Sequence, residues 1–351
     1  MTLFTVGPVE MYRETLELSA HQLPYFRTGE FSETTLHTEN LLLDLVQAPN
    51  SSRAVFLTAS GTGAMEAAVI NSLGSTDHAL VIDGGSFGHR FTQICQYHAI
   101  PHTALHLEFG KVLTAEMLDQ AYQNDMTALL INLNETSTGQ LYDINMIKTF
   151  CREHDLLLIV DAISAFIADP ISMEADGIDM LIISSQKALA LAPGISAIVL
   201  SPRAVDRVET RTTNTMYFDL KDYLKNGARG QTPFTPAVSS LLTLRQRLQS
   251  IAETGIDRVR DDIRNLAVDF RGKTAHLPVQ IPSYPLSNAL TPLYFPNGNA
   301  SEVYHLLREQ YDLTVTPSGG ELGRSLLRVG HIGNLTPQDN TRLVQAMREI
   351  T

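Results

Sequence analysis

The central part of the chain alternates short apolar runs with longer segments whose apolar residues recur at helical spacing. The apolar runs are 54–58, 79–82, 128–133, 156–160, 180–183 and 195–200, and the helical segments between them include 64–73 and 144–154. Strands that are apolar throughout are buried on both faces, and strands separated by helices run parallel. The pattern therefore predicts an α/β fold with a mostly parallel sheet, whose ligands gather at the carboxyl ends of the strands.

A different pattern begins near residue 240. A long charged helix is expected over 241–269, interrupted at Gly255, followed by strand-like pieces and a final helix over 337–350. At 351 residues and 44% hydrophobic content, the chain is long enough for two cores. We predict that residues 1–245 form an N-terminal segment and a large domain, and that residues 246–351 form a small C-terminal α+β domain.

Charge and cysteine content narrow the class of partner. A net charge of −12 disfavours nucleic acid and anionic membrane surfaces, because both are negatively charged. The apolar runs fall short of the roughly 20 residues that cross a bilayer, and no signal peptide is readable. The two cysteines, Cys95 and Cys151, are too few for a disulfide framework. We expect a cytoplasmic enzyme that acts on a small molecule.

The first segment that carries chemistry is a strand running into small residues that open a helix, at 57–68. Glycines let the backbone approach an anion, and a helix N-terminus offers free N–H groups with a partial positive charge. Ser60, Gly61, Thr62 and Gly63 are therefore a candidate phosphate cradle. A plain strand-to-helix turn is the alternative, since the segment fits neither a dinucleotide fingerprint nor a P-loop.

The second segment, 81–90, contains Gly84-x-Ser86-x-Gly88, which formally matches the nucleophile elbow of serine hydrolases. The match is weak, because His89 stands beside the serine and not far downstream. Phe87 offers a flat face against which an aromatic ring can stack, with ordinary core packing as the alternative.

Two further strands end in ionisable residues. Asp161 closes the apolar run 158–160, where an unpaired carboxylate is costly and a protonated pyridine nitrogen would be a suitable partner. A helix N-cap is the simpler interpretation of Asp161. Lys187 follows the apolar run 180–183 among uncharged neighbours, where a lysine can lose its proton and attack a carbonyl. A solvated surface lysine is the alternative there.

Other residues suggest anion or metal binding. Thr232 and Thr235 lie in a loop before a helix, and Arg328 lies among apolar residues, as suits the bidentate binding of a carboxylate or a structural ion pair. The histidines at 98, 102 and 106 stand four apart, but Pro101 interrupts any helix between them. We predict no metal site.

Taken in order, the motifs resemble the class V aminotransferases of pyridoxal phosphate (PLP) fold type I. They are Ser-Gly-Thr-Gly-Ala-Met-Glu-Ala at 60–67, Gly-Ser-Phe-Gly at 85–88, Glu-Thr-Ser-Thr-Gly at 135–139, Val-Asp-Ala-Ile-Ser at 160–164, Ser-Gln-Lys-Ala at 185–188, Thr-Pro-Phe-Thr-Pro at 232–236 and Leu-Arg-Val-Gly at 327–330. The resemblance spans nearly the whole chain, starting at Val6-Gly-Pro-Val. It is strongest toward the alanine–glyoxylate, serine–pyruvate and 2-aminoethylphosphonate–pyruvate transaminases.

The resemblance implies a role for each matching position. Lys187 would form the Schiff base with PLP and move the proton, Asp161 would hold the pyridine nitrogen, and Phe87 would stack on the ring. The remaining implied cofactor contacts are Ser60, Gly61, Thr62, Thr136, Ile163, Gln186, Thr232 and, from a neighbouring subunit, Thr235. The implied substrate contacts are Arg328, Gly7 and Arg27, and either Arg27 or Arg229 would read a phosphonate, although Arg229 also suits a surface position.

The resemblance also implies a homodimer with shared sites and ping-pong transfer of an amino group to pyruvate or glyoxylate. The donor would be 2-aminoethylphosphonate, alanine or serine. A fold type I lyase is the nearest alternative function. A desulfurase is disfavoured because no cysteine follows Cys151. A serine hydrolase built on Ser86 and a non-catalytic binding protein are more distant alternatives.

Overall fold

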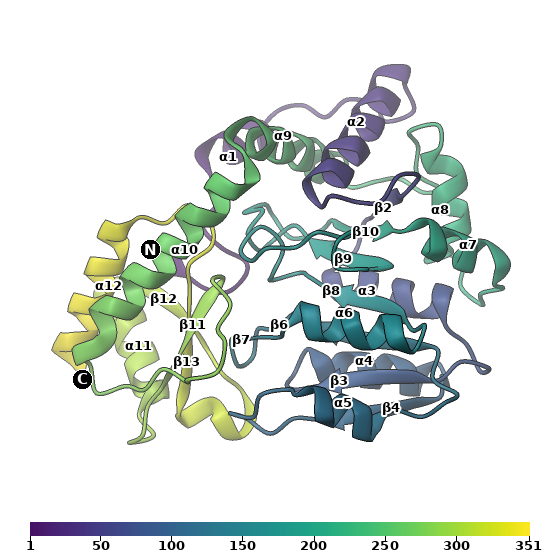
Figure 1. The fold of residues 1–351 in the computed structure, drawn as a ribbon. Coiled ribbons are helices and arrows are strands. Elements are labelled where there is room, and N and C mark those ends of the chain that lie inside the picture. Colours follow the sequence, from purple (N-terminus) through teal and green to yellow (C-terminus); the bar gives the residue numbers. More distant parts are fainter.

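The computed structural model describes residues 1–351, with the side chain of Glu321 left aside, and consists of two sheets side by side, each with its own helices (Figure 1). The strands are β1 Thr2–Phe4, β2 Arg53–Leu57, β3 Ala79–Asp83, β4 His102–His106, β5 Ala128–Asn132, β6 Asn134–Glu135, β7 Gln140–Leu141, β8 Leu157–Asp161, β9 Met180–Ser184, β10 Ser196–Leu200, β11 Leu290–Tyr294, β12 Leu313–Pro317 and β13 Leu326–Gly330. The helices are α1 Arg13–Ser19, α2 Gly29–Leu45, α3 Gly61–Ser72, α4 Gly88–Tyr97, α5 Ala115–Ala121, α6 Ile144–Glu153, α7 Pro202–Thr210, α8 Leu220–Gly227, α9 Val238–Thr254, α10 Ile256–Lys273, α11 Ala300–Tyr311 and α12 Pro337–Ile350, with short 3₁₀ turns at Thr274–His276 and Gly320–Arg324.

The large sheet has the strand order β2-β10-β9-β8-β5-β3-β4. β10 pairs antiparallel with both of its neighbours, and the other pairs are parallel. Each of the six apolar runs singled out in the sequence supplies one strand of this sheet. The predicted α/β fold with a mostly parallel sheet is therefore confirmed.

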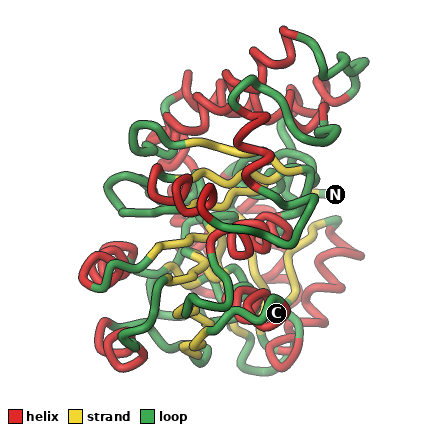
Figure 2. The backbone as a smooth tube through the Cα atoms, turned by 90° about the vertical axis from the view of Figure 1, so that its right-hand side faces the viewer, coloured by secondary structure: helices red, strands yellow, loops and turns green.

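Strand residues alternate between two cores, one on each face of the large sheet. In β5, Leu129 and Ile131 face a core that includes Leu118 of α5 and Ile147 of α6. Leu130 faces the opposite core, with residues of α3 and α4. Figure 2 shows the strands enclosed by helices on both sides. This double burial explains why the central strands β3, β5, β8, β9 and β10 are almost entirely apolar, whereas the edge strand β4 is partly exposed and carries two histidines.

The carboxyl ends of the parallel strands carry the polar segments. Ser60 follows β2, the glycine-rich turn 84–88 follows β3, Asp161 ends β8, and Lys187 stands three residues after β9. Because parallel strands end at the same edge of a sheet, the topology brings these segments together.

The small sheet has the order β1-β12-β13-β11 and packs against α10, α11 and α12. Its first strand comes from the start of the chain, because β1 pairs in parallel with β12 in the register Thr2 to Leu313. The hydrogen-bonding partners of residues 2–4 in the predicted N-terminal segment therefore lie in the C-terminal part of the chain. The division near residue 245 stays a prediction.

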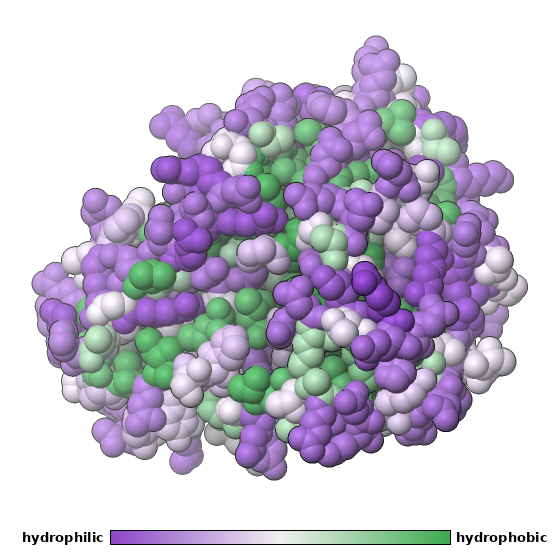
Figure 3. All heavy atoms as spheres, viewed as in Figure 1, coloured by the Kyte–Doolittle hydropathy of each residue, from purple (hydrophilic) through white to green (hydrophobic). Residues whose placement is uncertain are grey.

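Gly255 separates α9 from α10 with a φ of +87°, so the single long helix expected with an interruption at this glycine is two helices. Figure 3 shows hydrophilic residues over most of one face, with hydrophobic residues exposed in separate patches among them. Among the helices that the structure describes, none is long and apolar enough to cross a membrane.

Candidate active site

Lys187 is buried at the edge of the large sheet, with a side chain that is 7% exposed. Its Nζ donates a hydrogen bond to the Val6 carbonyl (2.6 Å) and lies 5.9 Å from the centre of the Phe87 ring. Burial, assisted by the positive charges of Arg328 and Arg90, lowers the pKa of the Lys187 amine to about 8. An amine with this pKa is partly neutral near pH 7, as a nucleophile or a proton carrier must be.

The N-terminal segment closes over this amine. A Cβ atom on Gly7 would lie 2.6 Å from Lys187 Cδ, and the φ of Gly7 is +129°, so the position has neither the room nor the backbone conformation for a side chain. The Val6 N–H donates to Thr316 Oγ1 (3.0 Å) in the small sheet. Gly7, predicted as a substrate contact, therefore lies against the lysine.

Asp161 is 5% exposed at the end of β8. Among the described residues its carboxylate accepts one hydrogen bond, at Oδ1 from the N–H of Ile163 (2.8 Å). That bond caps a turn and not a helix. Burial raises the pKa of Asp161 to about 7, with Glu135 adding to the rise and the positive charges of Lys187 and Arg90 opposing it. A carboxylate whose charged form is destabilised by burial is stabilised by a partner that carries a proton.

Phe87 directly precedes α4 and is fixed through its backbone by the fully buried Glu135. The carboxylate of Glu135 accepts hydrogen bonds from the N–H groups of Phe87 (3.4 Å) and Gly88 (2.9 Å), and from Asn132 Nδ2 (2.8 Å). The loop after β5 therefore holds the loop after β3. The sequence indicated Phe87 but not the role of Glu135.

The turn into α3 has the geometry expected of an anion cradle. Ser60 is the N-cap, and its Oγ accepts a hydrogen bond from the N–H of Gly63 (3.3 Å). A Cβ on Gly61 would collide with Ile163 Cδ1, so the two residues are in close contact. Thr62 Oγ1 accepts a hydrogen bond from Arg90 Nη1 (3.0 Å). The first N–H groups of a helix have no intrahelical partners and can bind a phosphate.

Gln186 directly precedes Lys187 in the chain, and Thr136 directly follows Glu135. Gln186 Oε1 accepts a hydrogen bond from Ser184 Oγ (2.6 Å), and Thr136 Oγ1 pairs with Ser164 Oγ (2.6 Å). The Thr136 carbonyl accepts from Arg328 Nη1 (3.1 Å), so the segment after β5 also contacts the small sheet.

Arg328 extends from β13 into a cavity of about 300 Å³ between the two sheets. Its Nη2 donates to the Pro317 carbonyl (2.8 Å), while its buried Nε has no hydrogen-bond partner among the described residues. The other residues that line the cavity are Gly84, Gly85, Ser86, Phe87, Leu107, Phe109, Ser137, Thr138, Ser318, Gly319 and Leu322. An unpaired guanidinium N–H beside a cavity suits the binding of a carboxylate.

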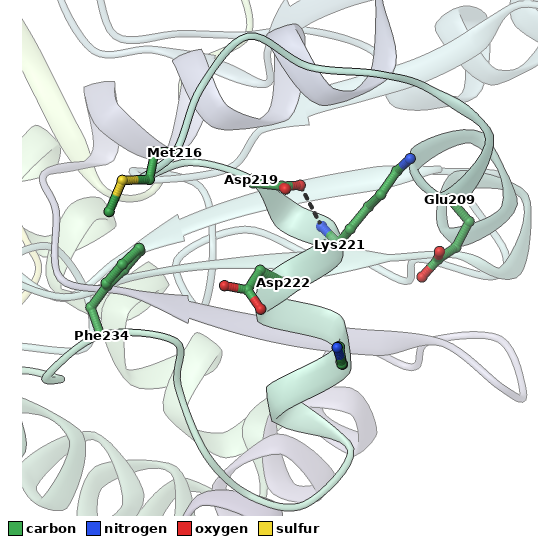
Figure 4. A pocket seen from close by; sticks show the side chains of 7 residues that line it. Glu209, Met216, Asp219, Lys221, Asp222 and Phe234 are labelled. Atoms are coloured by element: carbon green, nitrogen blue, oxygen red, sulfur yellow. Dashed lines mark hydrogen bonds between the residues drawn. The ribbon is translucent and has the colours of Figure 1, made fainter.

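A larger hollow of about 620 Å³ lies elsewhere, along α8 and the loop before it (Figure 4). Its lining carries charges of both signs, from Glu209, Asp219, Asp222, Lys221 and Lys225, and includes none of the predicted site residues. Because neither Lys187 nor Asp161 lines this hollow, we place the site at the cavity beside Arg328.

Arg27 and the loop 231–235 lie together outside the cavity lining. The exposed Arg27 donates to the carbonyls of Thr232 (2.9 Å) and Pro233 (3.3 Å), and Thr232 Oγ1 donates to the Phe234 carbonyl (2.6 Å). Thr235 is exposed. Within this chain these residues hold a loop, and the implied cofactor and substrate contacts of Arg27, Thr232 and Thr235 stay predictions.

The remaining polar residues singled out in the sequence have local partners. Arg229 is exposed and donates to Asn226 Oδ1 (2.7 Å), as its surface interpretation requires. His89 Nδ1 contacts Asp83 Oδ2 (2.9 Å) and not Ser86, which is exposed. His98 contacts Glu66, and His106 contacts Asp83.

The residues at this edge of the large sheet fit PLP. Asp161 favours a protonated partner, Lys187 has an amine of lowered pKa and Phe87 supplies a flat ring, while Gly61 lets Ile163 pack closely at the helix N-terminus, whose free N–H groups can meet a phosphate. Each of these properties comes from a different strand end, and together they match the parts of one cofactor.

Comparison with known proteins agrees with this fit. The family model "Aminotransferase class-V" matches residues 10–326. The "Soluble hydrogenase 42 kDa subunit" of Anabaena cylindrica is 30% identical over 97% of this chain and 90% of its own length. The "L-aspartate--glyoxylate aminotransferase" of Paracoccus denitrificans is 27% identical over 95% of this chain and 87% of its own length. The solved structure of an aspartate aminotransferase from Thermus thermophilus covers 100% of this chain and 99% of its own, with a TM-score of 0.92 and 25% identity.

Proposed function

The chain belongs to the class V aminotransferases and uses pyridoxal 5′-phosphate, and from this premise we propose that it transfers the amino group of alanine or serine to glyoxylate or pyruvate. The observation that carries the proposal is the charge of the cavity. Among its described lining residues, Arg328 is the only one with a charged side chain.

One guanidinium suits a substrate with one carboxylate. The second carboxylate of aspartate, or the second negative charge of the phosphonate in 2-aminoethylphosphonate, would have no second cation in this lining, and burying an unpaired negative charge is costly. The hydroxyls of Ser86, Ser137 and Ser318 in turn suit the hydroxymethyl group of serine, and the methyl group of alanine is smaller still. Donor and acceptor would use the same Arg328 in turn, which is why we also propose a ping-pong order.

The mechanism follows from which protein atoms hold a proton. Bound PLP supplies a conjugated ring that takes up the electrons of the bond broken at the donor's α-carbon. Asp161 would hold the ring nitrogen in its protonated form, and Phe87 would restrain the ring from one face. Lys187 Nζ would accept the proton from the α-carbon and return it, because its lowered pKa leaves it able to do both near neutral pH.

We further propose a homodimer that completes the site. Apolar side chains are exposed around the loop that carries Thr235: Tyr25 is 67% exposed and Met216 is 77% exposed, while Tyr217 stacks on Phe234 with ring centres 5.1 Å apart. A second copy would cover this surface and bring Thr235 to the neighbouring cradle. Light scattering of Met216→Asp should show monomers where the unchanged protein shows dimers; a monomeric unchanged protein that is fully active would contradict the shared site.

The hydrogenase in the name of the Anabaena cylindrica relative does not enter the proposal. Iron–sulfur clusters take about four cysteine ligands, and this chain has two cysteines. Both Cys95 and Cys151 are buried, and burial raises the pKa of each thiol to about 12, which disfavours the thiolate that binds metals.

The proposal is tested with the PLP-loaded protein and a panel of donors. Alanine, serine, aspartate and 2-aminoethylphosphonate are each offered with glyoxylate or pyruvate, and kcat/KM is measured. We expect alanine or serine to exceed the two doubly acidic donors at least about tenfold, the cost of about 1.4 kcal/mol of unpaired charge. Arg328→Gln should abolish this activity, whereas Arg324→Gln, at an exposed neighbour, should not. A preference for aspartate or 2-aminoethylphosphonate would overturn the proposal.

A further inference from the structure

Arg90 lies in the first turn of α4 and contacts two parts of the site that are far apart in sequence. Its guanidinium carbon is 5.0 Å from the centre of the Phe87 ring, and its Nη1 donates to Thr62 Oγ1 (3.0 Å) in the first turn of α3. One planar side chain therefore bridges the ring and the cradle.

The charge of Arg90 has no carboxylate partner among the residues that the structure describes. No carboxylate of the described residues lies within 4.0 Å of its guanidinium, although the side chain is half-buried. The positive charge of Arg90 helps to lower the pKa of Lys187 and opposes the rise in the pKa of Asp161, so it acts on both of these buried groups. A partly desolvated cation next to a helix N-terminus is an arrangement that favours an anion.

The backbone and the ring of Phe87 have separate supports. Glu135 fixes the backbone N–H of Phe87, but a hydrogen bond to the backbone does not set the angle of the ring. A guanidinium lying over an aromatic face does restrain that angle, through cation–π attraction and stacking. Arg90 supplies this restraint and links it to Thr62.

We propose that Arg90 is a positioning residue for the cofactor, which fixes the Phe87 ring relative to the α3 cradle and adds positive charge for the phosphate. This inference rests on the cofactor site described above and not on the identity of the amino donor. It assigns two separable effects to one side chain: a charge effect, directed at the phosphate, and a stacking effect, directed at the pyridine ring.

The test compares Arg90→Met and Arg90→Lys with the unchanged protein and with Arg152→Met, an exposed arginine on α6 as the control. Dissociation constants of PLP and of pyridoxal, which lacks the phosphate, are measured on the cofactor-free proteins by equilibrium dialysis. Visible circular dichroism then reports how asymmetrically the bound ring is held. Urea unfolding of each cofactor-free variant shows whether the fold is retained.

We expect Arg90→Met to weaken PLP binding at least about tenfold and pyridoxal binding less, because only PLP carries the charge that Arg90 favours. Arg90→Lys should recover most of the PLP affinity but not the visible dichroism, since lysine keeps the charge and loses the planar stack. If Arg90→Met binds PLP as tightly as the control, or loses affinity for PLP and pyridoxal equally, the inference is wrong. An unchanged protein that binds PLP yet converts none of the donors would overturn the proposed substrates while leaving the Arg90 result intact.

Discussion

Replacement of Asp161 by asparagine should make the cofactor-free protein more stable and the cofactor less effective as a stabiliser. The carboxyl has a pKa of about 7 in the folded chain against an ordinary value of 3.8. Each unit of difference is worth about 1.4 kcal/mol, so burial of the charged form costs about 4 kcal/mol at pH 8. Asparagine keeps the oxygen that accepts from Ile163 and removes the charge.

The sign of the pH dependence follows from proton binding. Between pH 4 and pH 7 the folded chain retains a proton on Asp161 that the unfolded chain has lost, so the free energy of unfolding falls as pH rises and levels off above pH 7. Asp161→Asn removes this fall. Its stability should match that of the unchanged protein near pH 4 and exceed it by about 2 to 4 kcal/mol at pH 8, the lower figure allowing for desolvation of the amide.

Urea unfolding of cofactor-free protein at pH 5 and pH 8, at one fixed protein concentration, measures the effect. Saturating PLP should then stabilise the unchanged protein more than Asp161→Asn, because only the carboxylate can pair with a protonated ring nitrogen. Asp119→Asn, an exposed residue on α5, is the control and should behave as the unchanged protein. If Asp161→Asn were no more stable than the unchanged protein at pH 8, the burial argument would be refuted.

Three further predictions concern neighbouring groups. The rate at which cofactor-free protein reacts with PLP should rise about tenfold from pH 6 to pH 7 and level off above pH 8, because the lowered pKa of Lys187 leaves about a tenth of the amine neutral at pH 7; stopped-flow absorbance measures it, and a rate independent of pH would contradict the assignment. Arg328→Lys should raise KM for the amino donor about tenfold with kcat little changed, because lysine keeps the positive charge but makes one charge-assisted hydrogen bond fewer. Steady-state kinetics measure both constants, and a fall in kcat with an unchanged KM would contradict the prediction. Gly61→Ala should weaken PLP binding by displacing Ile163, and Ile163→Val in the same chain should restore it because it removes the colliding Cδ1; equilibrium dialysis showing no restoration would mean that the cradle fails for another reason.

Most of the large sheet was predictable because six of its strands are apolar runs that are buried on both faces, whereas the edge strand β4 is partly exposed and contains two histidines. Lys187, Asp161 and the turn at Ser60 were predictable for the same reason, since each directly follows such a strand. The pairing of β1 with β12 was not, because three residues give no signal of a partner more than 300 positions away. The hydrogen bond between the Val6 carbonyl and Lys187 was not predictable either, because every residue has a backbone carbonyl and the sequence does not single this one out.

Arg90 and Glu135 show a second limit of the sequence. Both stand inside motifs that were noticed, Gly-Ser-Phe-Gly-His-Arg and Glu-Thr-Ser-Thr-Gly, yet their roles depend on which residues the fold brings opposite them. For Glu135 these are the N–H groups of Phe87 and Gly88. Arginine and glutamate are also common on surfaces, so only the observed burial and contacts distinguish these two.

Val6 joins the two halves of the molecule through the backbone of a single residue. Its N–H is bound by Thr316 of the small sheet, and its carbonyl accepts from the Lys187 amine of the large one. A rotation of one half against the other would therefore change the distance of one of these two contacts. The pKa of the Lys187 amine should then depend on the angle between the halves. A titration of this amine would therefore report how the two halves are oriented.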